Sequence, residues 1–409
     1  MEVSIFMKLQ FEPKTNIQLD PIGQFYASHI NEEYPGNYSI SAHLKGEINT
    51  QILQQATNDI MRRLPFLQGK LQAGSYWYYH EILANPPQIE PDYAAGDFSE
   101  YYTKGAGHVL RVLYGERHFK IETIHSICDG RGLTKIVVAL LARYFELLGV
   151  SMQKNNTIDC NGSFQLEECE DAFAKFADTK SIKILPQIDA YHHEGSKPAR
   201  VRVITKKFNL SKIKEASKAY NATVNGYILA HIFQAIAEER NARNSKKPIA
   251  SFMPIDLRSF FPTQTIRNFV SAATITMPES EKFSDVVKGI QEQFTKIDKD
   301  FVQNEINVLQ KVIEDIKDLP LSETTSVLKE LAQHRSDQVT TTFSNLGLVK
   351  LPTELEEYVE MLEFIVGREP DKAYSFGCIT IRDTLVLTAT INVENDDIVE
   401  VLMRRLGKE

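Results

Sequence analysis

A predicted strand that ends in a histidine and leads directly into a predicted long helix limits the possible folds of this chain more than any other segment. In HVLRVLYGERHFKIETIH, two strands flank a Gly-Glu turn, and the second keeps an alternating pattern until it stops at His125. Asp129 and Gly130 follow, and a helical pattern then covers residues 133–148 and closes at a glycine. Two strands followed by a long helix indicate an α/β protein.

The same order of strands and helices starts again in the second half of the chain, which also contains a long amphipathic helical region at 283–334. Between the halves, residues 151–199 are polar and irregular apart from one acidic amphipathic piece. At roughly 150 residues per domain, a chain of 409 residues favours more than one core. We therefore expect two α/β lobes, at 1–178 and 200–409, joined by a linker at 179–199.

Composition argues against several functional classes. The chain is 43% hydrophobic and 24% charged, as in ordinary soluble proteins, and its net charge of −8 argues against nucleic-acid or anionic-membrane partners. It has no apolar stretch long enough to cross a bilayer, and its first residues lack the apolar core of a signal peptide. Its four cysteines stand at no zinc-ligand spacing, so we expect free thiols, no metal and a cytoplasmic location.

His125 has two interpretations on residue chemistry alone. Histidine is the usual side chain for proton transfer at neutral pH, and a strand end beside a cleft between lobes would bring it to a substrate. A histidine at a strand end is also often only a structural hydrogen-bonding residue. Asp129 could orient the imidazole as a catalytic partner or hold the loop by pairing with an arginine, and Gly130 could supply a positive φ or leave room for a close approach.

The sequence resembles the CoA-dependent acyltransferase superfamily, which includes chloramphenicol acetyltransferase, the condensation domains of peptide synthetases and alcohol acetyltransferases. Two strands, His-x-x-x-Asp-Gly and a long helix carry the first part of this resemblance. Four further segments follow the order of the family, namely IMRRLPFLQGKL, LSKIKEASKAYNATVNGYILAHIFQAI, MPIDLRSFFPTQTIRNFVSAATI and FSNLG. Together the five segments are far more specific than the motif alone.

The resemblance implies two chloramphenicol-acetyltransferase-like lobes with an active-site tunnel between them, in which His125 acts as general base. An acceptor would then attack the acyl thioester directly, without an acyl-enzyme, with acyl-CoA as co-substrate and no bound cofactor. The resemblance makes Asp129 a structural residue that pairs with an arginine and keeps the motif loop, including Gly130, in shape. The first choice for this arginine is Arg63, in IMRRLPF, and its rival is Arg258, in IDLR.

Acyl transfer also needs a group that stabilises the developing oxyanion. Hydroxyl and amide side chains on predicted second-lobe strands are the candidates, with Ser344 as the first choice and with Ser271, Thr341, Thr342 and Asn345 as the others. The alternative for all of them is a hydrogen bond to neighbouring backbone at a strand edge.

Departures from the family patterns narrow the choice within the superfamily. Condensation domains usually carry two adjacent histidines, whereas here Ile124 precedes His125. Gln68 replaces the second arginine of the condensation-domain segment RHxxLR, and Ser271 replaces the asparagine of the FVN strand. The plant signature DFGWG is missing. These differences favour a stand-alone alcohol acetyltransferase.

The preferred hypothesis is therefore an O-acyltransferase with an acyl-CoA donor and a small-molecule alcohol acceptor. A free-standing condensation-type enzyme is the alternative, taking its acyl group from a carrier-protein thioester and passing it to an amine or hydroxyl. A non-catalytic binding module on the same fold is the third possibility. We expect a monomer, because two fused lobes already supply one interface.

Overall fold

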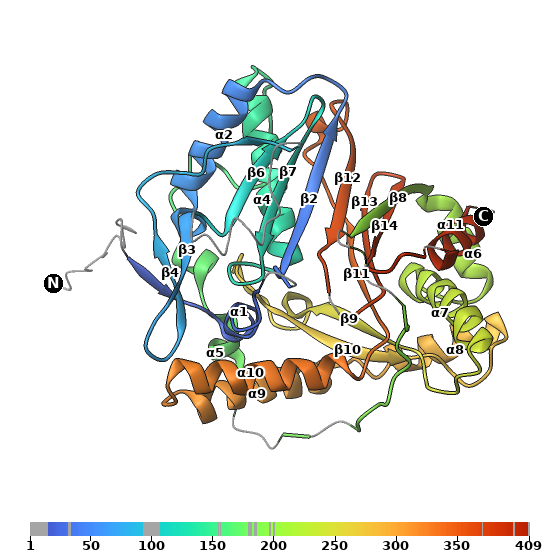
Figure 1. Cartoon of the computed structure of the whole chain (residues 1–409). Helices are drawn as coiled ribbons and strands as arrows, with labels where there is room; N and C mark the ends of the chain where they lie inside the picture. Colours follow the sequence, from blue (N-terminus) through green and yellow to red (C-terminus); the bar gives the residue numbers. More distant parts are fainter. Residues whose placement is uncertain are drawn as a thin grey trace.

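Two β-sheets, each covered by helices, lie side by side and form two lobes (Figure 1). The computed structural model describes residues 15–31, 34–92, 107–153, 155, 157–178, 182–183, 186–195, 198, 201–369, 371–395 and 397–407. None of the helices in these ranges is long and apolar enough to pass through a membrane.

The first lobe contains a five-stranded sheet in the order β12-β2-β7-β6-β5. Its strands are β2 (Asn37–Leu44), β5 (Glu90–Pro91), β6 (Leu110–Tyr114), β7 (His118–Ile124) and β12 (Val359–Val366). β6 and β7 are the predicted antiparallel pair before the motif. β12 pairs with β2, with Phe364 opposite Ile40. This strand therefore lies in the first lobe, contrary to the assignment of all of 200–409 to the second lobe; the rest of that division stays a prediction.

Two helices, α2 (Thr50–Arg63) and α4 (Gly130–Leu147), pack against each other on the first sheet. α4 begins a few residues before the predicted start at 133, because the Asp129 side chain caps it and accepts a hydrogen bond from the Gly132 N–H at 2.8 Å. Leu53, Ile60 and Leu141 are fully or almost fully buried in the core that these helices share with the sheet. Hydrophobic burial thus fixes α4, and its N-terminal end, against the lobe.

A small sheet in the order β1-β4-β3 flanks the first lobe. Its strands are β1 (Asn16–Gln18), β3 (Gly69–Ala73) and β4 (Tyr78–Ile82). A short helix, α1 (Pro21–Ala27), follows β1, and Asp20 caps it by accepting from the Gly23 N–H at 2.7 Å. The sequence pattern does not predict this helix, although a capping aspartate followed by proline is a typical helix start.

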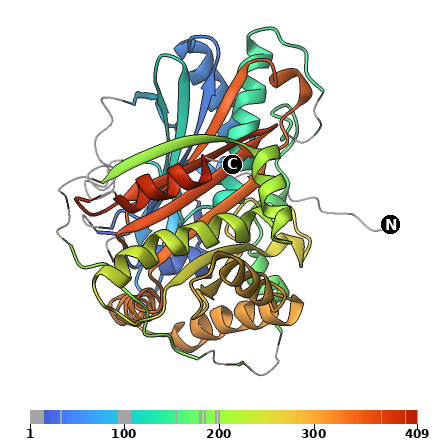
Figure 2. The same cartoon turned by 90° about the vertical axis from the view of Figure 1, so that its right-hand side faces the viewer.

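The second lobe contains a six-stranded sheet in the order β10-β9-β11-β13-β14-β8. Its strands are β8 (Arg202–Asn209), β9 (Ala250–Asp256), β10 (Val270–Thr276), β11 (Thr341–Leu348), β13 (Tyr374–Ile381) and β14 (Thr384–Ile391). Four helices form a second core with this sheet, namely α6 (Leu210–Ala219), α7 (Val224–Ala242), α8 (Phe283–Phe294) and α11 (Asp397–Leu406). Figure 2 shows α7 and α11 lying across the outer side of this lobe.

Three further helices connect the lobes: α5 (Ala172–Phe176), α9 (Lys299–Ile316) and α10 (Leu321–Ser336). Both α9 and α10 pack against α1, and α9 also packs against α5. A small core of its own lies here, in which Ile22, Phe173 and Ile306 come from three of these helices. Short 3₁₀ turns complete the elements: η1 (Pro65–Gln68), η2 (Leu166–Cys169), η3 (Leu257–Ser259) and η4 (Thr353–Leu355).

Candidate active site

His125 lies directly after β7, between two tyrosine rings. The Tyr26 ring stacks on one face of the imidazole, with ring centroids 4.4 Å apart and planes 22° apart. The Tyr38 ring stacks on the other face, also at 4.4 Å, with planes 27° apart. Tyr26 comes from α1 and Tyr38 from β2. The two rings fix the plane of the imidazole and leave its edges for polar contacts.

Asn268, in the second half of the chain just before β10, meets one edge of His125. Its Oδ1 lies 3.4 Å from Nδ1 of His125, at the long end of the hydrogen-bonding range. Its Nδ2 donates to the backbone carbonyl of His125 at 2.8 Å and to the two carboxylate oxygens of Asp20 at 3.0 and 3.2 Å. Asn268 is fully buried, so the histidine is held by residues of both halves of the chain.

Burial lowers the pKa of His125 below its usual value, while the Asn268 contact, the charge of Asp129 and the Cys128 backbone act in the opposite direction. The imidazole is therefore neutral at neutral pH, the state in which a histidine can accept a proton. Its neighbour Ser126 has a partner of its own, since the Ser126 hydroxyl and His80 Nε2 are 2.9 Å apart.

Asp129 points away from the imidazole and joins the two halves of the chain. One carboxylate oxygen caps α4, as described above, and the other accepts from the Phe269 N–H at 2.7 Å and from Arg258 at 2.9 Å. The Asp129 and Arg258 side chains are 3% and 8% exposed, so the pair is shielded from water. This arrangement agrees with the structural role that the family resemblance implied and does not form a His–Asp dyad.

The partner of Asp129 is Arg258, and the first choice of Arg63 is wrong. The guanidinium of Arg63 makes two hydrogen bonds to Glu168, at 2.6 and 2.8 Å, and a third to the Asp159 carbonyl. Arg258 instead follows β9, where the loop after the strand carries it to the motif. Sequence spacing could not separate the two arginines because each pairs with an acid more than 100 residues away in the chain.

Gly130 and Gly132 allow the second half of the chain to approach α4 closely. Gly130 does not have a positive φ, and a Cβ there would lie 2.6 Å from the Leu346 side chain. The approach is closer at Gly132, where a Cβ would lie 2.0 Å from the backbone oxygen of Ile266. The interpretation of Gly130 as room for a neighbour therefore holds, and the more demanding position, Gly132, was missed.

Ser344 is the oxyanion candidate whose hydroxyl has no hydrogen-bond partner in the part of the chain that the structure describes, and it lies on β11, the strand that also carries Leu346. Its neighbour on the same face of β11, Leu346, touches the Gly130 position, whereas Phe343 points into the second-lobe core.

The other oxyanion candidates have partners. Ser271 donates to Glu305 at 3.4 Å, and Asn345 holds a turn by accepting from the Gly347 N–H at 2.7 Å. Thr341 donates to the Tyr374 carbonyl at 2.7 Å and Thr342 to Glu369 at 3.1 Å.

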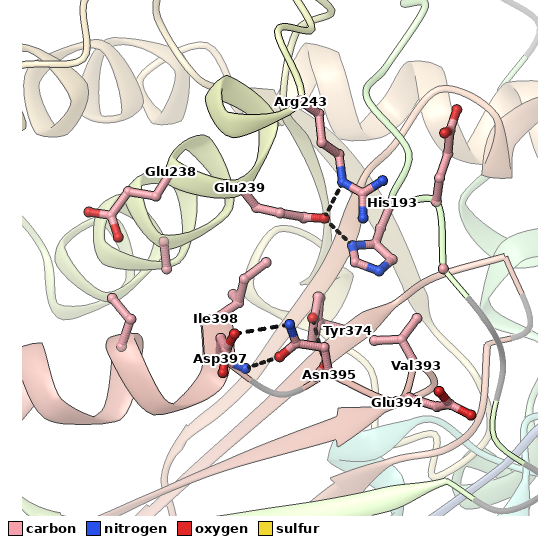
Figure 3. Close-up of a pocket in the computed structure, with 14 residues that line it drawn as sticks. His193, Glu238, Glu239, Arg243, Tyr374, Val393, Glu394, Asn395, Asp397 and Ile398 are labelled. Atoms are coloured by element: carbon pink, nitrogen blue, oxygen red, sulfur yellow. Dashed lines mark hydrogen bonds and ion pairs between the residues drawn. The ribbon is translucent and has the colours of Figure 1, made fainter.

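Figure 3 shows a cavity that is separate from the surroundings of His125 and lies on the second lobe, between α7 and the start of α11. His193, Glu239 and Arg243 line it, and the carboxylate of Glu239 pairs with the other two side chains. His125 is not among its lining residues. Within the described ranges, no group of three or more histidine, cysteine or acidic side chains is arranged to hold a metal ion.

Four residues around this site were not predicted: Tyr26, Tyr38 and Asn268, which contact His125, and Asp20, which contacts Asn268. All four come from segments far from the motif, and Tyr26 lies on a helix that was not predicted. A weak signal existed for Asn268, which directly precedes the FVS segment compared with the family's FVN strand.

The comparisons with known proteins agree with this geometry at the level of the fold. No protein-family model matches the sequence, and no curated protein matches it either. Among solved structures, polyketide synthase associated protein 5 from Mycobacterium tuberculosis matches with a TM-score of 0.61 and 15% identity, over 97% of this chain and 98% of its own. F. sporotrichioides TRI101 complexed with coenzyme A and T-2 gives 0.62 and 13% over 96% and 98%.

The condensation domain of Monacolin K polyketide synthase MokA gives a TM-score of 0.60 and 13% identity over 96% of this chain and 97% of its own. The chain has the CoA-dependent acyltransferase fold. This acyltransferase fold confirms the expected α/β architecture of two chloramphenicol-acetyltransferase-like lobes. The tunnel between the lobes stays a prediction.

Proposed function

We propose that this protein is an O-acyltransferase that moves an acyl group from acyl-CoA to the hydroxyl of a small-molecule alcohol. The observation that carries the proposal is the placement of His125: a neutral, half-buried imidazole where the two halves of the chain meet, with Asp129 engaged elsewhere. The fold supports it, since TRI101 has the same fold and is described in complex with coenzyme A and a second small molecule, T-2.

In the proposed reaction, His125 takes the proton from the acceptor hydroxyl while the hydroxyl oxygen attacks the thioester carbonyl carbon. The tetrahedral intermediate collapses with cleavage of the C–S bond, and the imidazolium returns the proton to the leaving thiolate. The products are the ester and free CoA, and no bond to the protein forms. One proton is taken and one is returned, so the histidine is unchanged after each cycle.

Ser344 is the proposed donor to the oxyanion of the intermediate. It lies on β11, the strand whose Leu346 side chain lies beside Gly130, and its hydroxyl has no other partner among the described residues. A pre-oriented hydrogen-bond donor of this kind stabilises the transition state more than the ground state, because the negative charge on the carbonyl oxygen develops only in the transition state.

A second candidate has the same base but a different donor. Condensation domains and a polyketide synthase associated protein share the fold at TM-scores of 0.60 and 0.61. These relatives support a free-standing condensation-type enzyme that uses an acyl thioester on a carrier protein and an amine or hydroxyl acceptor. The chemistry at His125 would be the same, so the donor is the point to test.

The deciding assay measures free thiol released from a panel of acyl-CoAs with mixed alcohols, for wild type and His125→Ala. A matched control is His118→Ala, at the other end of the same strand, where the histidine pairs with Asp92 at 3.0 Å. Loss of a general base lowers kcat by roughly 100- to 10,000-fold, so we expect release by wild type and the control only.

Three outcomes separate the hypotheses. Equal release by wild type and His125→Ala would contradict the assignment of His125 as the base. Release only from an acyl-loaded carrier protein, again lost in His125→Ala, would favour the condensation-type enzyme. Binding of acyl-CoA or carrier without turnover by either donor would favour a non-catalytic module.

A further inference from the structure

The orientation of the Asn268 amide follows from its partners. Its Nδ2 group lies within 3.2 Å of three atoms that can only accept hydrogen bonds: two carboxylate oxygens of Asp20 and the carbonyl oxygen of His125. The nitrogen must therefore be on that side, and Oδ1 faces the imidazole. An amide oxygen can only accept, so the facing ring nitrogen, Nδ1, has to carry the proton.

We propose that Asn268 and Asp20 are positioning residues that hold His125 as the Nδ1–H tautomer, and that the charge of Asp20 strengthens His125 as a base. The inference rests on the proposed function of His125 as a base, because only then does a free Nε2 serve a purpose. With Nδ1 protonated, Nε2 carries the lone pair and can accept the proton of the acceptor hydroxyl.

Tyr26 and Tyr38 hold the imidazole in the orientation in which Nδ1 faces Asn268. Because Tyr26 and Tyr38 stack on opposite faces of the ring, the imidazole cannot tilt out of its plane without losing one of them. The Asn268 contact then selects which nitrogen of the fixed ring is protonated. A base held in one tautomer is ready for each turnover without reorganisation.

We call the chain of contacts from Asp20 through Asn268 to His125 the relay. The charged groups around the relay determine how it responds to pH. Burial raises the pKa of Asp20 to about 6, while the nearby Arg267, the Gly23 N–H and Asn268 act to lower it and the charge of Asp171 raises it. The Arg267 guanidinium is 3.4 Å from the Asp20 carboxylate. Asp20 is thus ionised above about pH 6.

On the side of His125, the groups that act on it are Tyr26, Tyr38, Asn268, Asp129 and the backbone of Cys128. Both nearby carboxylates have an arginine partner, Asp129 with Arg258 at 2.9 Å and Asp20 with Arg267 at 3.4 Å. Asp20 is the carboxylate that contacts the amide facing Nδ1. An anion behind Asn268 favours the imidazolium, which raises the proton affinity of Nε2.

The test is nitrogen NMR of the full-length protein labelled with ¹⁵N in its histidine rings, because the two ring nitrogens of each tautomer give distinct shifts. His125→Gln identifies the His125 signals among those of the ten histidines. We expect wild type to show the Nδ1–H tautomer and Asn268→Ala to shift His125 towards Nε2–H. An Nε2–H tautomer in wild type, or an unchanged tautomer in folded Asn268→Ala, would overturn the proposal.

Asp20→Asn removes the charge of Asp20. This variant should fold even if Asn268→Ala does not, because asparagine also caps a helix well and Asp20 caps α1. We expect an NMR titration to give a lower pKa for His125 in this variant than in wild type, since the anion is removed. An unchanged titration of His125 would overturn the role of Asp20.

A kinetic arm links the relay to the reaction. For Asn268→Ala we expect kcat for acyl transfer to fall at least about 10-fold, while the KM for acyl-CoA stays within about 2-fold. A rise in KM with an unchanged kcat would overturn the positioning role. The NMR results need no substrate, so a wild-type protein with the expected tautomer but no acyl transfer would contradict the proposed function and leave the relay intact.

Discussion

Removing the charge of Arg258 should destabilise the docking of the two halves of the chain. Arg258 donates to Asp129 and Asp256, both at 2.9 Å, and to the Arg267 and Thr265 carbonyls at 2.6 and 3.1 Å. Arg258→Met keeps much of the buried stem and removes every one of these donors. The change leaves the Asp129 carboxylate buried without its cation.

Breaking a buried ion pair on one side costs about 3–5 kcal/mol. Asp129 keeps two backbone donors, the N–H groups of Gly132 and Phe269 at 2.8 and 2.7 Å. These two hydrogen bonds still compensate part of its charge. We therefore expect Arg258→Met to lower the free energy of unfolding by about 3 kcal/mol, at the lower end of that range. In Asp129→Asn the same pair is lost from the other side, and the double variant should be about 2 kcal/mol more stable than the sum of the single changes predicts.

The measurement is a double-mutant cycle by urea denaturation at pH 7.5. Arg63→Met is the matched control, because Arg63 also makes a buried ion pair, with Glu168 at 2.6 Å. Arg63→Met should destabilise the protein but add to Asp129→Asn within about 0.5 kcal/mol. A coupling of Asp129 to Arg63, or additivity between Asp129 and Arg258, would refute this account of the motif loop.

Two further changes test other parts of the structure. The pKa of His231 is lowered by burial to about 4. As the pH falls, the unfolded chain therefore takes up a proton at this histidine before the folded protein does. The free energy of unfolding that is present above about pH 6.5 should decrease as the pH falls towards 4, by a total of about 3 kcal/mol. His231→Phe should flatten the dependence of the urea midpoint on pH between 7.5 and 4.5, and parallel curves for both proteins would speak against it. Gly132→Ala should cost about 1–3 kcal/mol, because its Cβ would lie 2.0 Å from the Ile266 oxygen. Gly130→Ala should cost less, and equal thermal midpoints of the two variants would contradict that reasoning.

The order of strands and helices could be predicted from the sequence because local patterns determine it. The hairpin before His125, the long helix after it and the helical region at 283–334 all follow from periodicity and capping residues, and the structure has them. The short helix α1 was not predicted, because its two turns are too brief for a periodic pattern.

The environment of His125 was only partly predictable, because it is built from pairings distant in the chain. The motif gave the histidine and its aspartate, but the contacts of Asn268 with His125 and Asp20 depend on how the lobes dock. The partner of Arg63 is also distant in the chain, and a guanidinium can pair with any nearby acid. The structure pairs Arg63 with Glu168, in the acidic amphipathic piece of residues 151–199.

The pairing of β12 with β2 has a consequence for synthesis on the ribosome. Strand β2 is complete once residue 44 is made, but its partner ends at residue 366. At roughly 5–20 residues per second, the free edge of β2 waits on the order of 15 to 60 s for β12. An unpaired strand edge can join another chain during that time. A fragment that ends at the linker should therefore aggregate more readily than the full chain.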